Sequence, residues 1–296
     1  GQYFSQPAQW VLCGNGAADL IWRLALVLRP QKGLVTAPSF AEYEAALQFA
    51  GCRTERFVLS EKNDFTVPPE FAQRIKPGVG LVFLCQPGNP TGRTVSRRVI
   101  LAALRQCRAV GAKLVVDECF TGFLPNRESV SSCSLLADWP ELVILGAFTK
   151  LWAMAGLRLG WCLCSDTALL QRLQAAAQPW SVNGPAQAAG IAALQDEEYP
   201  QRVRALLRTQ RPRMAAALQA LGMRVVPGQA NYLLFYCRQP LSEGLQALGV
   251  SIRSCENYPG LGPGWYRTAV RTGPENDALL AALAKVLKGQ NEDPQE

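Results

Sequence analysis

Short apolar runs alternate with amphipathic segments from the N-terminus to about Trp180, and this alternation constrains the fold more than any other feature. The amphipathic segments 17–28 and 96–110 place apolar side chains at helical spacing. Runs that are continuously apolar are typical of strands buried on both faces of a parallel sheet. The sequence therefore predicts an α/β core with a mostly parallel sheet. The predicted strands are residues 33–36, 54–58, 80–85, 113–117, 142–147 and 159–164.

The pattern changes after Trp180. Long helices are predicted over 185–195 and 198–221, and shorter strands and helices follow them. We therefore expect a large domain over residues 1–195 and a smaller C-terminal α+β domain over 196–296, whose polar tail frays from Gly289 onward. In the smaller domain the predicted strands are 223–226, 231–236, 250–253 and 266–270, and the predicted helices are 241–248 and 275–287.

Composition excludes several classes of function. The 296 residues include no histidine, which excludes a Cys/His zinc site and a Ser-His-Asp triad, and we expect no metal. The net charge is +7, but the basic residues are scattered among acids, so nucleic acid is not an expected partner. No apolar run is long enough to span a membrane. The ten cysteines contain no C-x-x-C pair, and we interpret them as free thiols of a cytoplasmic protein.

Lys150 is the first candidate for chemistry. It follows the predicted strand 142–147 and precedes the apolar residues 151–155, so we expect a dry amine. Desolvation lowers the pKa of an amine and makes it nucleophilic, as Schiff-base chemistry requires. The alternative is a surface lysine after a strand.

A phosphate dianion can bind at the same edge of the predicted sheet. Arg158 offers a guanidinium group, and Thr149 lies beside the candidate lysine. The segment 14–18 opens a predicted helix, whose first N–H groups are free to bind an anion. The alternative for this glycine-rich segment is a structural turn.

An aromatic ring can bind between the remaining motifs. Asp117 ends a predicted strand, where a buried carboxylate needs a cation such as a protonated pyridine nitrogen. A helix cap or an ion pair with lysine is the alternative. Asn89, in the turn 87–92, can donate to a phenolic oxygen, and Phe40 can stack on the ring or simply pack in the core. Because ligands bind beyond the carboxyl ends of parallel strands, we expect these motifs to form one site.

Together these motifs resemble those of the class I/II aminotransferase family, pyridoxal-phosphate (PLP) enzymes of the aspartate-aminotransferase type. The resemblance covers nearly the whole chain and rests on segments 14–16, 38–43, 89–92, 117–120, 149–150 and 156–160. It implies the PLP-dependent transferase fold of type I, a homodimer, and pyridoxal 5'-phosphate held on Lys150 with Asp117 against its ring nitrogen. The other implied cofactor contacts are Gly16, Ala17, Ala18, Phe40, Asn89, Thr149 and Arg158.

Within this family, segments 178–183 and 252–261 resemble threonine-phosphate decarboxylases most, and histidinol-phosphate aminotransferases come next. Phe120 stands where the family usually has a tyrosine beside the cofactor, as in decarboxylase-like members. The resemblance thus implies decarboxylation of O-phospho-L-threonine in cobalamin biosynthesis, while an aminotransferase and an impaired PLP-binding homologue stay open. Family members usually extend further upstream than Gly1.

Three arginines are candidates for the small anionic amino-acid substrate. Arg253, Arg267 and Arg271 offer guanidinium groups for a carboxylate and a phosphate. Arg271 falls where the family's carboxylate-binding arginine is expected. Surface arginines at strand ends are the alternative.

Overall fold

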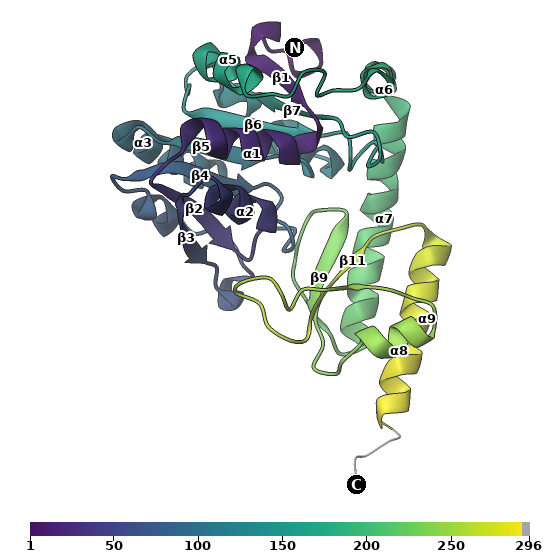
Figure 1. Ribbon diagram of the computed structural model, residues 1–296. Coiled ribbons are helices and arrows are strands. Elements are labelled where there is room, and N and C mark those ends of the chain that lie inside the picture. The colour runs from purple at the N-terminus through teal and green to yellow at the C-terminus, as the bar shows by residue number, and fades with distance from the viewer. Residues whose placement is uncertain (292–296) are drawn as a thin grey trace.

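The computed structural model describes residues 1–291 and contains a seven-stranded sheet in the order β1-β7-β6-β5-β4-β2-β3 (Figure 1). Strands β3, β2, β4, β5 and β6 run parallel, whereas β7 and β1 are antiparallel to their neighbours. The strands are β1 Val11–Gly14, β2 Lys32–Ala37, β3 Arg53–Val58, β4 Val79–Cys85, β5 Lys113–Asp117, β6 Leu142–Ala147 and β7 Gly160–Leu163.

Helices cover both faces of this sheet, which explains why its strands are continuously apolar. Leu114 and Val116 of β5 pack in the core under α3, whereas Val115 between them packs in the core under α1, α2 and α5. Both faces of the strand are therefore dry. The helices are α1 Gly16–Leu28, α2 Ala41–Phe49, α3 Arg97–Val110, α4 Arg127–Val130 and α5 Thr167–Ala175.

A second, four-stranded antiparallel sheet in the order β10-β11-β9-β8 belongs to the C-terminal part. Helix α7 runs from α6 beside the large sheet to this second sheet, with α9 next to it (Figure 1). The elements are α6 Gly184–Gln195, α7 Glu198–Ala220, β8 Arg224–Val225, β9 Tyr232–Tyr236, α8 Ser242–Ala247, β10 Arg253–Ser254, β11 Trp265–Ala269 and α9 Gly273–Asn291. The predicted α/β architecture with a smaller α+β part is confirmed, and the boundary at residue 195 stays a prediction.

Several elements differ from the sequence-based prediction. Strand β1 and helices α2 and α5 were not predicted, because β1 is short and α2 carries a weak apolar stripe. Helix α9 continues to Asn291, past the expected start of the polar tail at Gly289, while 292–296 lie outside the described residues. Within residues 1–291 no helix has both the length and the apolar character to cross a bilayer.

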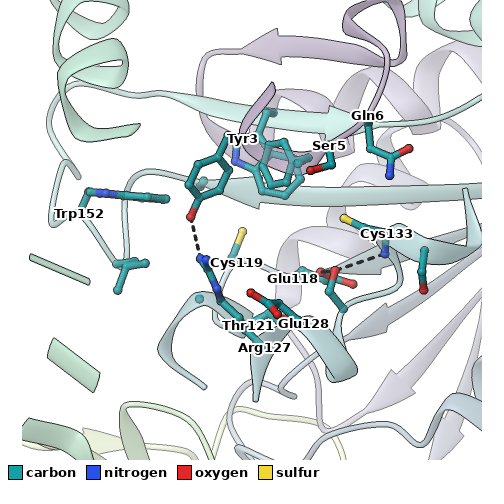
Figure 2. Close-up of a pocket in the computed structure, with 17 residues that line it drawn as sticks. Tyr3, Ser5, Gln6, Glu118, Cys119, Thr121, Arg127, Glu128, Cys133 and Trp152 are labelled. Carbon is teal, nitrogen blue, oxygen red and sulfur yellow. Dashed lines mark hydrogen bonds between the residues drawn. The ribbon is translucent and has the colours of Figure 1, made fainter. Parts of the chain in front are cut away.

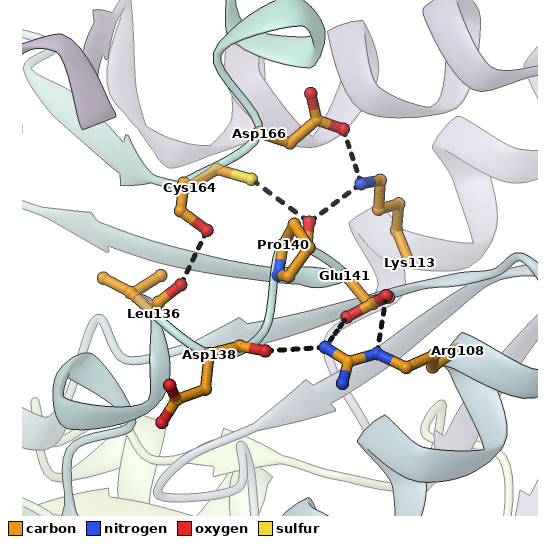
Figure 3. A network of polar contacts seen from close by, with 9 residues as sticks. Arg108, Lys113, Leu136, Asp138, Pro140, Glu141, Cys164 and Asp166 are labelled. Atoms are coloured by element: carbon orange, nitrogen blue, oxygen red, sulfur yellow. Dashed lines mark hydrogen bonds and ion pairs between the residues drawn. The ribbon is translucent and has the colours of Figure 1, made fainter.

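An ionic network fixes the edge of the sheet where β5 and β6 begin (Figure 3). Arg108 of α3 donates from Nε and Nη2 to the two carboxylate oxygens of Glu141, at 3.0 and 2.9 Å, and this pairing lowers the pKa of Glu141. Lys113 Nζ donates to Asp166 Oδ2 at 2.7 Å and to the Pro140 carbonyl at 2.8 Å. These charges lie at the amino ends of the strands, so they leave the carboxyl ends free for a site.

Candidate functional site

A cavity of about 430 Å³ opens beyond the carboxyl ends of the parallel strands and is closed from the other side by the second sheet. It brings together six of the predicted site residues, although they come from segments far apart in the sequence. The large sheet contributes Phe40, Asn89, Phe120 and Lys150, and the second sheet contributes Arg253 and Arg267.

Asp117 ends β5 beside this cavity and is 5% exposed. Tyr43 Oη donates to its Oδ2 at 2.6 Å, and the Cys119 N–H donates to its Oδ1 at 3.0 Å. Burial and the neighbouring carboxylate raise the pKa of Tyr43 well above its ordinary value, so the phenol remains a donor. Two donors therefore hold the carboxylate in one orientation.

Lys150 stands at the mouth of the cavity, with Nζ 5.5 Å from the centre of the Phe120 ring. The expectation of a dry amine is wrong, because the turn after β6 leaves the side chain exposed to solvent. The Lys150 ammonium group and Asp117 nevertheless act on the same neighbour, Cys119. Burial raises the pKa of the Cys119 thiol most, Asp117 raises it further, and Lys150 lowers it. Lysine and aspartate thus flank the same thiol.

The first turn of α1 and Arg158 form a cradle for an anion. A methyl group on Gly16, whose φ is +84°, would lie 2.7 Å from Arg158 Nη2, and one on Gly160 would overlap the Ala17 nitrogen. The guanidinium group therefore lies directly against the backbone that opens the helix, where N–H groups lack helical partners. Thr149, half-buried, follows β6 at the same edge. Ala18 lies in the same turn of α1.

Asn89 is buried, and its amide joins the two sheets. Its Oδ1 accepts hydrogen bonds from an Arg267 Nη1 and, at 3.4 Å, from Tyr258 Oη. Arg267 also lies 5.1 Å above the ring of Tyr232, whose hydroxyl donates to the Gly88 carbonyl at 2.7 Å. Because Oδ1 is occupied, Nδ2 is the group left to donate into the cavity.

The sequence did not identify Tyr43, Tyr232 or Tyr258 as site residues. Tyr43 stands three residues after Phe40 at the start of a helix, a spacing that places both side chains on one side. Tyr258 lies in the segment 252–261, which the sequence marks only by its resemblance to threonine-phosphate decarboxylases. The helical spacing and the resemblance therefore indicate which segments form the site, but they do not identify which residues in each segment make the contacts.

The other two arginines differ from each other. Arg253 lines the cavity, and its guanidinium lies 5.9 Å above the Tyr258 ring. Arg271 is exposed and pairs with Glu275 at 2.7 Å, one turn further along the chain in α9. Strand β11 ends at Ala269, so Arg271 follows the chain toward α9 and does not line the cavity. Its substrate role stays a prediction.

A second cavity of about 380 Å³ is lined by the loop that follows β5 and by residues 3–6, and Figure 2 shows its lining residues. Arg127 Nη1 donates to Tyr3 Oη at 2.8 Å on one side of it. Glu118 is buried on another side and accepts hydrogen bonds from Ser131 Oγ and the Ser132 N–H, both at 2.7 Å. Burial raises the pKa of Glu118 to about 7, against these two hydrogen bonds.

Comparison with known proteins identifies the family. The model of the aminotransferase class I and II family matches residues 2–283. The chain belongs to this family. It is 38% identical over 287 residues to threonine-phosphate decarboxylase of Salmonella typhimurium, covering 96% of this chain and 78% of that one. It is 37% identical over 210 residues to histidinol-phosphate aminotransferase of Symbiobacterium thermophilum, covering 70% of this chain and only 56% of that one.

A solved structure is also similar. The histidinol-phosphate aminotransferase of Clostridium acetobutylicum has a TM-score of 0.92 at 26% identity, over 97% of this chain and 86% of that one. The predicted type I fold is therefore confirmed. The protein is a PLP-dependent enzyme.

The residues present fit this cofactor. The cavity combines an amine, an amide donor and four aromatic rings, and a buried carboxylate lies beside it. The space that a methyl group on Gly16 would occupy lies against the guanidinium of Arg158. The phosphate, the ring and the aldehyde of the cofactor each match a group of the protein.

We expect Gly16→Ala to weaken PLP binding about tenfold or more, because the added methyl group displaces the Arg158 guanidinium. Titration of the apoprotein with PLP, followed by absorbance, measures the change. Gly111→Ala is the matched control: φ is +74° there too, but its methyl group meets open space. Equal PLP affinity in the two variants would contradict the cradle.

The pKa of Glu118, raised from 4.5 to about 7, predicts a pH-dependent stability. Between these values the folded state holds more protons than the unfolded state, so the free energy of unfolding falls as the pH rises, by about 1–3 kcal/mol. Urea unfolding of wild type and Glu118→Gln at pH values below and above this window measures it. The variant should lose this component, and Glu128→Gln, at an exposed glutamate of the same cavity, should retain it. A difference between wild type and Glu118→Gln that is constant with pH would refute the assignment.

Proposed function

We propose that the chain decarboxylates O-phospho-L-threonine to 1-amino-2-propanol phosphate, a reaction of cobalamin biosynthesis. The observation that carries this proposal is the 38% identity to the Salmonella typhimurium decarboxylase along 96% of the chain. Phe120, which lines the cavity where the family usually has tyrosine, supports it.

The cofactor would be held by residues already described. Lys150 would bind it covalently through Nζ, Asp117 would accept a hydrogen bond from its protonated ring nitrogen, and Asn89 Nδ2 would donate to its phenolic oxygen. Phe40 would cover a ring face. Arg158, Thr149 and the first turn of α1 would hold its phosphate. When bound, pyridoxal phosphate supplies an electron sink for the pair released from a bond at the substrate Cα.

The substrate's two anionic groups would be bound by arginines of the second sheet. Arg267 and Arg253 both line the cavity, and each guanidinium group matches a carboxylate or a phosphate. We assign the substrate carboxylate to Arg267. This arginine contacts Asn89, the proposed cofactor ligand, and so would lie nearer the cofactor than Arg253. Once carbon dioxide has left, Lys150 Nζ would supply a proton to Cα.

An aminotransferase of the histidinol-phosphate type is the second candidate. The 37% identity to the Symbiobacterium thermophilum enzyme favours it, and the same lysine would move a proton at Cα. An impaired homologue that binds PLP without turnover is the third.

The test uses two reactions. PLP-loaded protein is given O-phospho-L-threonine while carbon dioxide is measured, and then histidinol phosphate with 2-oxoglutarate while glutamate is measured. We expect carbon dioxide alone. Lys150→Ala should lower its rate by at least about 100-fold and abolish the colour that borohydride fixes to the peptide with Lys150. Lys62→Ala, at an exposed lysine, is the control.

Other outcomes decide between the candidates. Glutamate without carbon dioxide would replace the proposal by the aminotransferase. Bound PLP with neither product would leave the impaired homologue. Colour that survives in Lys150→Ala would remove the role of the lysine.

We also propose a homodimer in the cytoplasm. Helix α6 is apolar around most of its circumference, yet it buries only Ala186, Gly190 and Ala193, and Ile191 on its outer side is 63% exposed. Trp180 before it is 95% exposed. A surface of this kind is typical of an interface, and a second copy is the partner that the family resemblance implies. The ten free thiols support a reducing compartment.

Ile191→Glu should shift the protein from dimer to monomer, because a charge on that face would be buried without a partner. Sedimentation velocity measures the mass. Leu248→Glu, at an apolar residue that is 38% exposed after α8, should leave the dimer intact. A monomeric wild type, or a dimer unaffected by Ile191→Glu, would argue against this face.

A further inference from the structure

The residues that follow β5 take part in two cavities. Phe120 lines the cofactor cavity, whereas Glu118 and Cys119, the two residues before it, line the second cavity of about 380 Å³ (Figure 2). The proposed reaction uses only the first cavity. We propose that the second cavity is a binding site for a small organic cation with an apolar body, in which Glu118 supplies the counter-charge. This inference goes beyond the proposed function and does not rest on it.

Four aromatic rings line the second cavity in a connected series. The ring centres of Trp152 and Tyr3 lie 6.1 Å apart, and those of Tyr3 and Phe4 lie 5.0 Å apart. Trp161 follows at 4.3 Å from Phe4. Trp152 is held in place by its Nε1, which donates to the Ala193 carbonyl at 3.1 Å. Aromatic rings cover the apolar part of a ligand and attract a cation through their faces.

Glu118 is a buried carboxyl group without a cationic partner. It is 7% exposed, and its two hydrogen bonds come from neutral donors, Ser131 Oγ and the Ser132 N–H. Within residues 1–291 no lysine or arginine lies close enough to form an ion pair with it. An ionised carboxylate is costly to bury unless a cation compensates it, and two donors leave further lone pairs of the carboxylate free. A bound cation would supply the missing charge.

The arginine of this cavity makes its contacts with Tyr3. Arg127 Nη1 donates to Tyr3 Oη at 2.8 Å, and its guanidinium group lies 5.7 Å from the centre of the Tyr3 ring. Glu128, which is exposed, adds a second carboxylate to the lining. Two carboxylates against one guanidinium group favour a cation over an anion. The aromatic rings favour an organic cation over a metal ion, which binds through oxygen, nitrogen or sulfur ligands.

The charge of Glu118 depends on pH in the neutral range. Burial raises its pKa to about 7, against its hydrogen bonds, and Asp117 raises it further. A cation beside the carboxylate stabilises the ionised form, so a cation binds more tightly as the pH rises through this value. Burial raises the pKa of the Cys133 thiol to about 12 and that of Cys119 well above its ordinary value, so both thiols stay neutral there. The other charged groups of the lining and its neighbourhood are Asp117, Arg127 and Glu128.

The test measures binding of benzyltrimethylammonium to the PLP-loaded protein by isothermal titration calorimetry. This probe keeps its charge at every pH and cannot form a Schiff base with the cofactor. We expect saturable binding, with an affinity that rises about tenfold from about pH 5.5 to about pH 8.5. The neutral alcohol 2-methyl-1-phenylpropan-2-ol has nearly the same shape. It should bind at least about tenfold more weakly at the higher pH, and without pH dependence.

Variants with matched controls locate the probe. Glu118→Gln should remove the pH dependence and leave only the weaker binding, whereas Glu128→Gln, at the exposed glutamate, should retain the pH dependence. Tyr3→Leu removes a ring of the series and should weaken binding at least about fivefold, whereas Tyr3→Phe should not. Tyr3 is 37% exposed, so neither change endangers the fold. Tyr258→Leu, in the cofactor cavity, should leave the affinity unchanged.

Each result decides the question. Absence of binding at either pH, or an affinity that is the same at both, overturns the inference. Binding that is weakened by Tyr258→Leu and not by Glu118→Gln overturns it too, because the probe then occupies the cofactor cavity. An alcohol that binds as tightly as the cation removes the role of the counter-charge. None of these results bears on decarboxylation, which the release of carbon dioxide tests separately.

Discussion

The register of β5 between β4 and β6 is the constraint on which the site depends. Asp117 pairs with Cys85 on one side and with Leu145 on the other, and the chain leaves all three strands at the same edge. The backbone extends this alignment, because Gln86 N–H donates to the Asp117 carbonyl and Glu118 N–H to the Leu145 carbonyl, both at 2.8 Å. A shift of one residue would turn Asp117 to the opposite face of the sheet.

Asp117 and Glu118 show how that edge separates two neighbouring carboxyl groups. Consecutive side chains leave a strand on opposite sides, so Asp117 meets Tyr43 while Glu118 meets Ser131 in the second cavity. Each receives two donors, yet they come from different elements. The chain can therefore hold one group against the cofactor cavity without placing a second carboxylate there, where it would repel an anionic substrate.

Much of this arrangement could be predicted from the sequence, because continuous apolar strands and the motifs at their ends obey general rules of parallel sheets. What the sequence could not determine depended on single side chains. Arg267 and Arg271 are four residues apart, and only the end of β11 at Ala269 separates the arginine in the cavity from the one that pairs with Glu275. Lys150 has apolar neighbours in sequence, but exposure is set by the path of the turn. Tyr43 reaches Asp117 across 74 residues, a distance no local pattern encodes.

The contact between Asn89 and Arg267 links the two halves of the site. A guanidinium group can only donate, so the amide must present Oδ1 to it and direct Nδ2 toward the cavity. The arginine of the second sheet thereby fixes which way an amide of the large sheet points. An anionic substrate that engages Arg267 draws on the same guanidinium group, which has further N–H donors in its planar fork. The Arg267 side chain can therefore bind the substrate and orient the Asn89 amide at the same time. A lysine, with its single ammonium group, could not do both equally well.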